Sequence, residues 1–214
     1  DAEPPRMSYV VAIVGHDPRV VVLQLGVFEG VGEAKRRLCD MARGDILVEL
    51  DHDDLLAPGA LADIEAAFVD PDIGFAYSDF AEFTEADGKP HIYRGSGWDT
   101  APLTVIHGRP LIPMQAFEPF ARSMAQILFA PNHVRAWRRS AYIAAGGHDP
   151  SMRVADDFDL MCRTYLTTRM VRIPKCLYVY RRRADGGNTW LAHCADIQAS
   201  CGQGADPSLP DCAQ

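Results

Sequence analysis

The segment with the clearest chemical signature is an acidic cluster that directly follows an apolar run at residues 45–50. Asp51, Asp53 and Asp54 form the cluster, and His52 lies between the first two carboxylates. Negative charge gathered at the end of a buried strand is costly unless a cation neutralises it. Mg²⁺ and Mn²⁺ suit such a position, because they need few protein carboxylates and complete their coordination with water and phosphate oxygens. The alternative is a solvated helix N-terminus, which also attracts carboxylates.

A second acidic pair lies further along the chain. Asp156 and Asp157 open a predicted helix over residues 156–168, and the stretch Gly-Gly-His-Asp at residues 146–149 precedes them. Repulsion between adjacent carboxylates would raise one pKa toward neutrality, where a base speeds proton removal from a hydroxyl by roughly 10²- to 10⁴-fold. Simple capping of the helix explains the pair equally well. The first cluster is therefore a candidate metal site, and the second contains a candidate general base.

The elements that must position these clusters alternate between strands and helices. Apolar runs and turn residues predict strands at residues 10–14, 20–25, 45–50, 73–78 and 170–180. Helical spacing and capping residues predict helices over 31–42, from Pro58 through Leu61, Ile64 and Phe68, from Ser140 to the glycines at 146–147, and over 156–168. This alternation is typical of a three-layer α/β fold with a mostly parallel central sheet, in which ligands gather at the carboxyl ends of strands. We therefore expect one Rossmann-like α/β/α sandwich.

The composition excludes several classes of protein. The net charge of −8 argues against a general nucleic-acid binder, whose affinity comes from clustered Lys and Arg. No apolar stretch is long enough to cross a bilayer, and the acidic, proline-rich start does not resemble a signal peptide. The six cysteines include no Cys-x-x-Cys pair, which favours a reduced setting. We expect a soluble, cytoplasmic protein.

Three segments taken together resemble family 2 glycosyltransferases of the GT-A fold. They are residues 44–54 (GDILVELDHDD), residues 146–149 (GGHD) and residues 156–160 (DDFDL), and the resemblance spans roughly residues 9 to 190. It implies an inverting enzyme that moves a sugar from a nucleotide-diphosphate sugar to a hydroxyl acceptor by a single in-line displacement. Uridine diphosphate is the default expectation for the nucleotide.

The resemblance also implies the metal and the base. The strand-end Asp-X-Asp signature falls on Asp51 and Asp53, which would hold Mn²⁺ or Mg²⁺ against the donor diphosphate with Asp54 in support. The family's catalytic base falls on Asp157, with Asp156 as its neighbour.

Further residues are expected to contact the substrates. On the donor side these are His52 beside the metal carboxylates, Lys35 on the preceding helix, and the basic run Arg181, Arg182 and Arg183, whose forked donors suit a diphosphate. A solvated helix face explains Lys35 almost as well. On the acceptor side we expect Asp79 at the end of a strand, His133, and Trp137 as a sugar-stacking platform, although a core tryptophan is equally consistent.

The chain departs from the family pattern at two places. The usual opening strands that hold the base and ribose are not visible, and residues 1–25 resemble the connection that follows them. Relatives often place a His after a Tyr-Arg pair in the last strand, where this chain has its arginine run. We expect a donor and metal part over residues 1–87, an acceptor-side part with the base helix over 88–183, and a flap or tail over 184–214.

Two other functions remain open on the sequence. A catalytically degenerate glycosyltransferase-like subunit would bind a partner or glycan without transfer. A His-Asp phosphohydrolase is suggested by three His-Asp dipeptides, but that fold is all-helical. The acceptor could be a glycan, a lipid-linked molecule or a small molecule, and a homodimer is left open.

Overall fold

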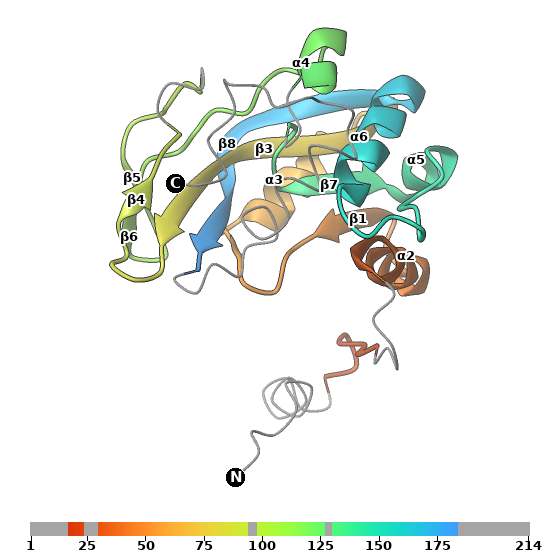
Figure 1. Ribbon diagram of the computed structural model, residues 1–214, viewed down its shortest axis with the longest axis horizontal. Coiled ribbons are helices and arrows are strands. Elements are labelled where there is room, and N and C mark those ends of the chain that lie inside the picture. The colour runs from red at the N-terminus through yellow and green to blue at the C-terminus, as the bar shows by residue number, and fades with distance from the viewer. Residues whose placement is uncertain (1–16, 24–29, 94–97, 127–129, 184–214) are drawn as a thin grey trace.

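A twisted, mixed β-sheet runs through the centre of the molecule (Figure 1). The computed structural model describes residues 17–23, 30–93, 98–126 and 130–183. Across the main sheet the order of strands is β1 (Ile46–Glu49), β7 (Arg135–Arg138), β3 (Ile73–Thr84), β8 (Arg169–Arg182) and β2 (Leu55–Leu56), with β4 (Pro90–His91) paired to β3. The α/β class expected from the sequence is confirmed.

The pairing in this sheet differs from the mostly parallel arrangement that we predicted. Among the described strands only β3 and β8 pair in parallel, and the other pairs are antiparallel. Two of the antiparallel pairs involve β7, which inserts between β1 and β3 and runs against both of them. The long connection before β7 lets the chain return from the far end of the sheet, so no parallel crossover is required. β1, β3 and β8 still point in one direction.

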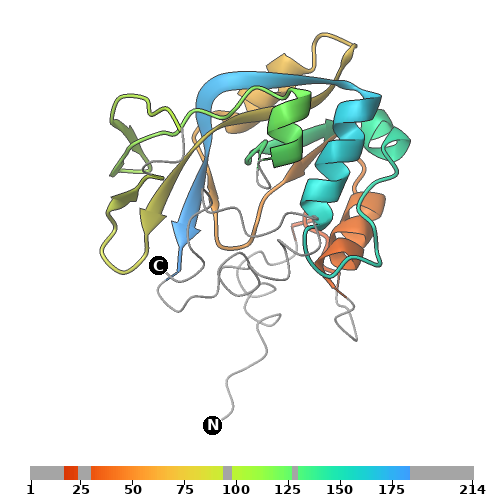
Figure 2. The same ribbon diagram turned by 45° about the horizontal axis from the view of Figure 1, so that its top comes forward.

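Strand β3 is longer than the sequence suggested. The prediction ended this strand at residue 78, but the strand continues to Thr84 because Phe80, Ala81 and Phe83 keep it buried. β3 and β8 pair along their whole length, from Ile73 opposite Arg169 to Thr84 opposite Arg182, and curve together through the molecule (Figure 2). Asp79 therefore lies in the middle of the sheet rather than at its edge.

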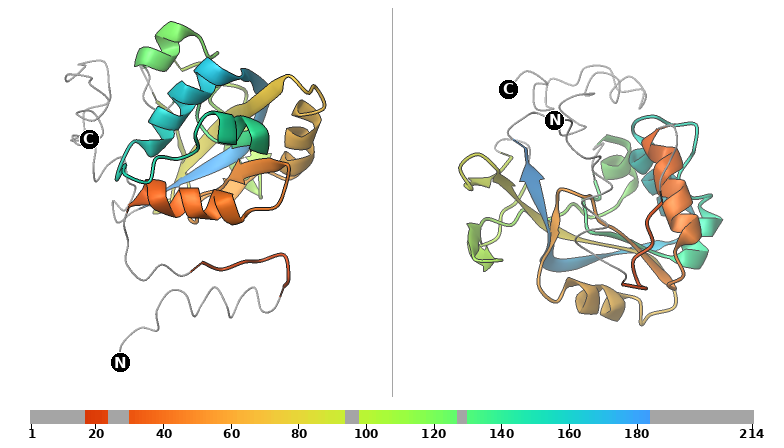
Figure 3. Two further views of the ribbon diagram at one scale, coloured as in Figure 1. Left: turned by 90° about the vertical axis from the view of Figure 1, so that its right-hand side faces the viewer. Right: turned by 90° about the horizontal axis from the view of Figure 1, so that it is seen from below.

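Helices cover both faces of the sheet, as a three-layer fold requires (Figure 3). On one face lies α3 (Ala60–Ala67), and on the other lie α2 (Val31–Met41), α5 (Arg139–Ala144) and α6 (Asp156–Thr167), with the short α4 (Ala121–Gln126) beside α6. Because side chains alternate along a strand, Ala76 of β3 packs on the side of Ile64, whereas Phe75 and Tyr77 pack on the side of Leu160. One apolar core lies on each face of this part of the sheet, and a third cluster lies around Phe83 and Leu111.

The helices lie close to their predicted positions, with one difference in burial and one at a boundary. Leu61 was expected on the buried face of α3 but is exposed, because the buried stripe starts at Ala60 and continues through Ile64. Helix α5 begins at Arg139, one residue before the expected cap at Ser140. No helix in the described ranges is both long and apolar enough to span a membrane.

A β-hairpin lies between β4 and β7, in a stretch where we predicted no strand from the sequence. β5 (Thr104–Ile106) and β6 (Arg109–Leu111) are joined by His107 and Gly108, which both have positive φ angles, 51° and 74°. Such a two-residue turn matches the twist of the flanking strands. His107 Nε2 lies 2.7 Å from Leu56 O, which ties the tip of the hairpin to β2.

Some predictions fall outside the described residues. These are the strand at residues 10–14 and the flap or tail at residues 184–214. The strand at 20–25 is described only to residue 23, and residues 20–23 are not in a strand.

Candidate active site

The acidic cluster lies on the loop after β1, as predicted, and Asp54 attaches this loop to β8. The Asp54 carboxylate accepts hydrogen bonds from the Tyr178 hydroxyl at 2.9 Å and from the Arg181 backbone N–H at 2.9 Å. The Asp51 backbone N–H donates to the same Tyr178 hydroxyl at 3.2 Å. Asp54 therefore has a structural role that the sequence did not separate from that of Asp51 and Asp53.

Burial raises the pKa of Asp54 to about 7, against the opposing hydrogen bonds from Arg181 and Tyr178. Because the folded protein then binds this proton more tightly than the unfolded chain, the contribution of Asp54 to stability is full below the ordinary pKa of 3.8 and is lost as the pH rises through about 7.

We expect Asp54→Asn to flatten this pH dependence. Thermal unfolding of metal-free protein, measured from about pH 4 to about pH 8, should show a smaller loss of stability with rising pH in the variant than in the wild type. The exposed Asp72→Asn is the matched control and should keep the wild-type slope. An unchanged slope in Asp54→Asn would show that the native pKa of Asp54 is not raised.

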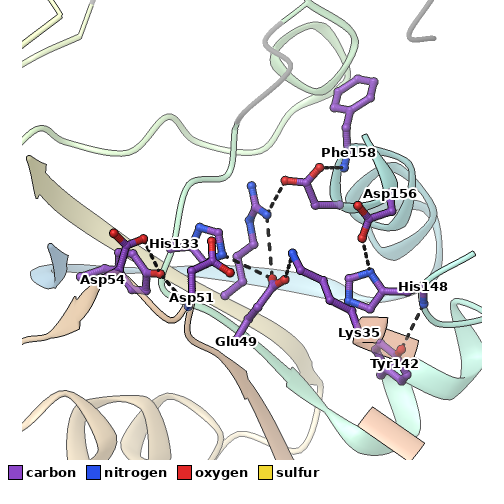
Figure 4. Close-up of polar contacts among 12 residues, drawn as sticks. Lys35, Glu49, Asp51, Asp54, His133, Tyr142, His148, Asp156 and Phe158 are labelled. Carbon is purple, nitrogen blue, oxygen red and sulfur yellow. Dashed lines mark hydrogen bonds and ion pairs between the residues drawn. The ribbon is translucent and has the colours of Figure 1, made fainter. Parts of the chain in front are cut away.

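Glu49, the last residue of β1, meets three basic side chains. Lys35 of α2 forms an ion pair with its carboxylate, His133 Nε2 lies 3.5 Å from Oε2, and Arg135 Nη1 lies 3.9 Å from the same oxygen. Figure 4 shows the Lys35 ammonium group and the Glu49 carboxylate facing each other. Burial raises the pKa of a carboxyl, but Lys35, His133 and Arg135 outweigh it and hold the pKa of Glu49 well below its ordinary value. Glu49 is therefore a buried anion.

Asp157 lies at the start of α6 in contact with one of the same cations. Its Oδ2 lies 2.7 Å from Arg135 Nη1, and its side chain is 33% exposed whereas that of Arg135 is 2% exposed. Burial is again outweighed, here by the charges of Arg135 and Lys35, so the pKa of Asp157 is below its ordinary value. The expectation that one carboxylate of the pair would have a raised pKa is thus wrong for Asp157, because two cations face it.

Asp156 points away from its neighbour. Its Oδ2 lies 2.9 Å from His148 Nδ1, both side chains are buried, and the His148 backbone N–H donates to the Tyr142 hydroxyl at 3.1 Å (Figure 4). This pair connects the two motifs around residues 146–149 and 156–157. It anchors the start of α6, and the expected catalytic role of Asp156 beside Asp157 stays a prediction.

The three residues expected on the acceptor side have other surroundings. Trp137 is buried, and its indole N–H donates to Thr164 Oγ1 at 3.1 Å, so its ring belongs to the core. Asp79 is buried within β3, where Arg172 Nε and Nη2 contact its carboxylate at 2.8 and 3.0 Å. Neither residue is placed to contact an acceptor sugar.

His133 belongs to the Glu49 side of the site instead of the acceptor side. Its ring stacks on Tyr178 with centroids 4.8 Å apart, and its Nδ1 lies 2.8 Å from the Tyr180 hydroxyl. This arrangement directs Nε2 toward Glu49. The imidazole is thus held by two tyrosines of β8.

Only some of the residues expected to contact the donor lie near the acidic loop. Lys35 is nearly enclosed and paired with Glu49, so it is not on a solvated helix face, while His52 is exposed with Nδ1 3.8 Å from Asp53 Oδ1. Arg181 lies next to the acidic loop through its backbone contact with Asp54. Arg182 Nη1 lies 3.5 Å from the buried Glu82, and Arg183 directly follows β8.

Three side chains at the acidic loop and beside it form a donor set that fits a divalent cation, and of the expected metal ligands only Asp51 is among them. Glu49, Asp51 and His133 each present one ligand atom, and these atoms lie within 4.8 Å of one another. In the part of the chain that the structure describes, His133 Nε2 is buried without a hydrogen-bond partner. Carboxylate oxygens suit Mg²⁺ and Mn²⁺, whereas imidazole is a more typical ligand of Zn²⁺ and other transition metals. Of these three donors, Glu49 is also paired with Lys35.

Sequence reasoning missed Glu49, Arg135, Tyr178 and Tyr180. The sequence contained a signal for Glu49, since a charged residue interrupts an otherwise apolar strand. It also contained one for Arg135, which has the apolar neighbours Val134 and Ala136 in the sequence. Such residues are stable in a core only with a partner. The partners lie far along the chain and were not visible.

The curled sheet, with the acidic loop after β1 and the acidic start of α6 on one side, is the arrangement of GT-A glycosyltransferases. The family model "Glycosyl transferase family 2" matches residues 8–143, more than half of the chain. The chain therefore belongs to glycosyl transferase family 2, which confirms the family expected from the sequence. A search of curated proteins finds no match.

Solved structures of S. aureus TarS 1-349 share this fold. One is 16% identical with a TM-score of 0.57, covering 93% of this chain and 53% of that chain. Its complex with UDP-GlcNAc is 16% identical with a TM-score of 0.60, covering 94% and 54%, and its complex with UDP is 16% identical with a TM-score of 0.57, covering 85% and 49%. At this identity the likeness shows the fold, and the chain spans about half the length of these TarS chains.

Proposed function

We propose that this chain transfers a sugar from a nucleotide-diphosphate sugar to a hydroxyl acceptor with inversion at the anomeric carbon. The observation that carries the proposal is the contact of Asp157 with Arg135, whose guanidinium also lies 3.9 Å from Glu49, two residues before Asp51. The UDP and UDP-GlcNAc in the TarS complexes support a uridine nucleotide as the first donor to test.

The donor would bind at the acidic loop. Asp51 and Asp53 would hold Mn²⁺ or Mg²⁺, which neutralises charge on a diphosphate leaving group when bound. Arg181, beside this loop, supplies a guanidinium for the phosphate oxygens. Lys35 would not contact the donor directly, because its ammonium group is paired with Glu49; it would compensate the negative charge of Glu49.

Asp157 would take the proton of the acceptor hydroxyl. The acceptor oxygen forms a bond to the anomeric carbon, the bond from that carbon to the phosphate oxygen breaks, and its electron pair leaves with the diphosphate. Because the pKa of Asp157 is below its ordinary value, this carboxylate is charged at neutral pH and receives the proton as the hydroxyl becomes acidic in the transition state. Inversion requires that Asp157 deliver the acceptor oxygen to the face of the anomeric carbon opposite the leaving group.

Metal-dependent binding of nucleotide is the first test of the proposal. Wild-type protein with Mn²⁺ and UDP at about 100 times Kd should gain about 2.7 kcal/mol of stability, measured as a rise in Tm. Without Mn²⁺ the rise should shrink, and in Asp53→Ala it should vanish. Glu65→Ala, on the exposed face of α3, removes an acidic side chain elsewhere and should keep the wild-type response.

The outcomes separate the proposal from its alternative. If UDP, GDP and other nucleoside diphosphates fail to stabilise the protein with any divalent cation, the donor-binding proposal is overturned. Binding without transfer to glycan, lipid-linked or small-molecule acceptors would instead favour the degenerate binding subunit. The division of the chain at residues 87 and 183 stays a prediction.

A further inference from the structure

Glu49 lies where the two halves of the site meet. It ends β1 two residues before Asp51, and its side chain is 11% exposed. An anion in such a place is unstable without compensation, and the compensation here comes from other elements: Lys35 from α2, and His133 and Arg135 from the segment that includes β7. The Glu49 carboxylate thus lies close to basic side chains from two other parts of the fold.

Arg135 connects this carboxylate to Asp157. Its Nη1 lies 2.7 Å from Asp157 Oδ2 and 3.9 Å from Glu49 Oε2, and its Nε donates to Pro131 O at 3.0 Å. The side chain is almost fully buried, and a guanidinium keeps its charge at any accessible pH. Its place is therefore set by two hydrogen-bond acceptors, Pro131 O and Asp157, and by the nearby charge of Glu49; the Asp157 carboxylate is more exposed than that of Glu49.

We propose that Glu49 is a positioning residue for the transfer reaction: its buried carboxylate holds Lys35 and Arg135 in place, and through Arg135 it fixes Asp157 beside the acidic loop. The inference rests on the proposed function, because the position of Asp157 matters to the reaction only if Asp157 accepts the acceptor's proton. In this role Glu49 acts through Lys35 and Arg135 and not through contact with the substrate.

Charge balance explains why this position requires an anion. Asp157 faces Arg135 from β7, Lys35 from α2 and Glu49 from β1, whereas Asp156 on its own helix is paired with His148. Without the charge of Glu49, two buried cations would have Asp157 as their nearest anion. They would draw it inward and make it a weaker base, so geometry and basicity would both suffer.

The first test compares Glu49→Gln with the wild type and with Glu49→Asp. We expect kcat to fall by roughly 10²-fold in Glu49→Gln with little change in the KM for donor, since misplacing a catalytic group by about 1 Å has that effect. Glu49→Asp keeps the charge and should recover part of the loss. A folded Glu49→Gln protein with wild-type kcat would overturn the inference.

Glu82→Gln is the matched control. Glu82 on β3 is also a buried glutamate and contacts an arginine and a histidine, Arg182 and His91, but it does not face Asp157. Both substitutions remove a buried charge, so both lower stability. Only Glu49→Gln should change the acidic limb of the pH profile of kcat/KM.

The direction of that change is the specific readout. Removing the negative charge of Glu49 should move the acidic limb to lower pH, whereas Arg135→Gln removes a positive charge and should move it to higher pH. If either residue had a purely structural role, its substitution would reduce the amount of active protein and leave the acidic limb of the pH profile in place. If Glu49→Gln does not fold, Arg135→Lys provides a second test, because lysine keeps the positive charge but lacks the forked donors of the guanidinium. This variant should lose kcat to the same extent, but its acidic limb should not move to higher pH as in Arg135→Gln.

NMR titration of the Asp157 carboxyl in ligand-free protein separates this inference from the proposed function. Opposite shifts of its pKa in Glu49→Gln and Arg135→Gln, with no transfer by the wild type, would overturn the proposed function and with it the catalytic role of Glu49. An active wild type whose Asp157 titrates identically in both variants would overturn the inference and leave the proposed function in place.

Discussion

Asp157→Asn should abolish sugar transfer while leaving donor binding intact. We expect kcat to fall by roughly 10²- to 10⁴-fold, the range that a positioned base contributes. The amide keeps the shape of the side chain but cannot take a proton. Measurement of kcat with saturating donor, beside UDP binding followed by thermal shift, checks both halves of the expectation.

Asp159→Asn is the control for this substitution. Asp159 lies two residues further along α6 and is paired with Arg163 at the surface, so its loss should leave transfer unchanged. Because the pKa of Asp157 is below its ordinary value, wild-type transfer should lose this base only at acidic pH. Unchanged transfer in Asp157→Asn would remove this residue as the base.

Trp137→Ala should have the largest effect on stability, because the ring is part of the core. The side chain packs against Phe75 with ring centroids 4.8 Å apart and donates to Thr164. We expect the free energy of unfolding to fall by about 3–5 kcal/mol, the usual cost of deleting a large buried aromatic side chain. Urea denaturation monitored by circular dichroism measures it.

The exposed Leu166→Ala on α6 should change the unfolding free energy little and provides the comparison. The two interpretations of Trp137 make opposite predictions. A stable Trp137→Ala protein with a raised KM for acceptor would restore the stacking platform that the sequence suggested.

Local sequence patterns predicted the elements that position the site. The apolar run before Asp51 became β1, and the helices expected over residues 31–42 and 156–168 formed within one residue of those limits. These elements could be predicted because periodicity and turn residues are properties of neighbouring residues. The acidic loop and the start of α6 were placed correctly for the same reason.

The partners of the charged residues could not be predicted in this way. The role of Asp79 depends on Arg172, and the pKa of Asp157 depends on Arg135 and Lys35, all of which are distant in sequence. Strand β7 was missed because its four residues begin and end with arginine and resemble an exposed segment. Its antiparallel insertion then set the surroundings of Trp137.

The tie between Asp54 and β8 has a consequence for the order in which the site is completed during synthesis. Residues 51–54 leave the ribosome well before Tyr178 and Arg181, whose hydroxyl and backbone N–H hold the Asp54 carboxylate. A nascent chain that ends at residue 168 would contain every acidic residue of the site but none of the strand that fixes the acidic loop. Competence to bind a cation should therefore arise late, when β8 docks along β3.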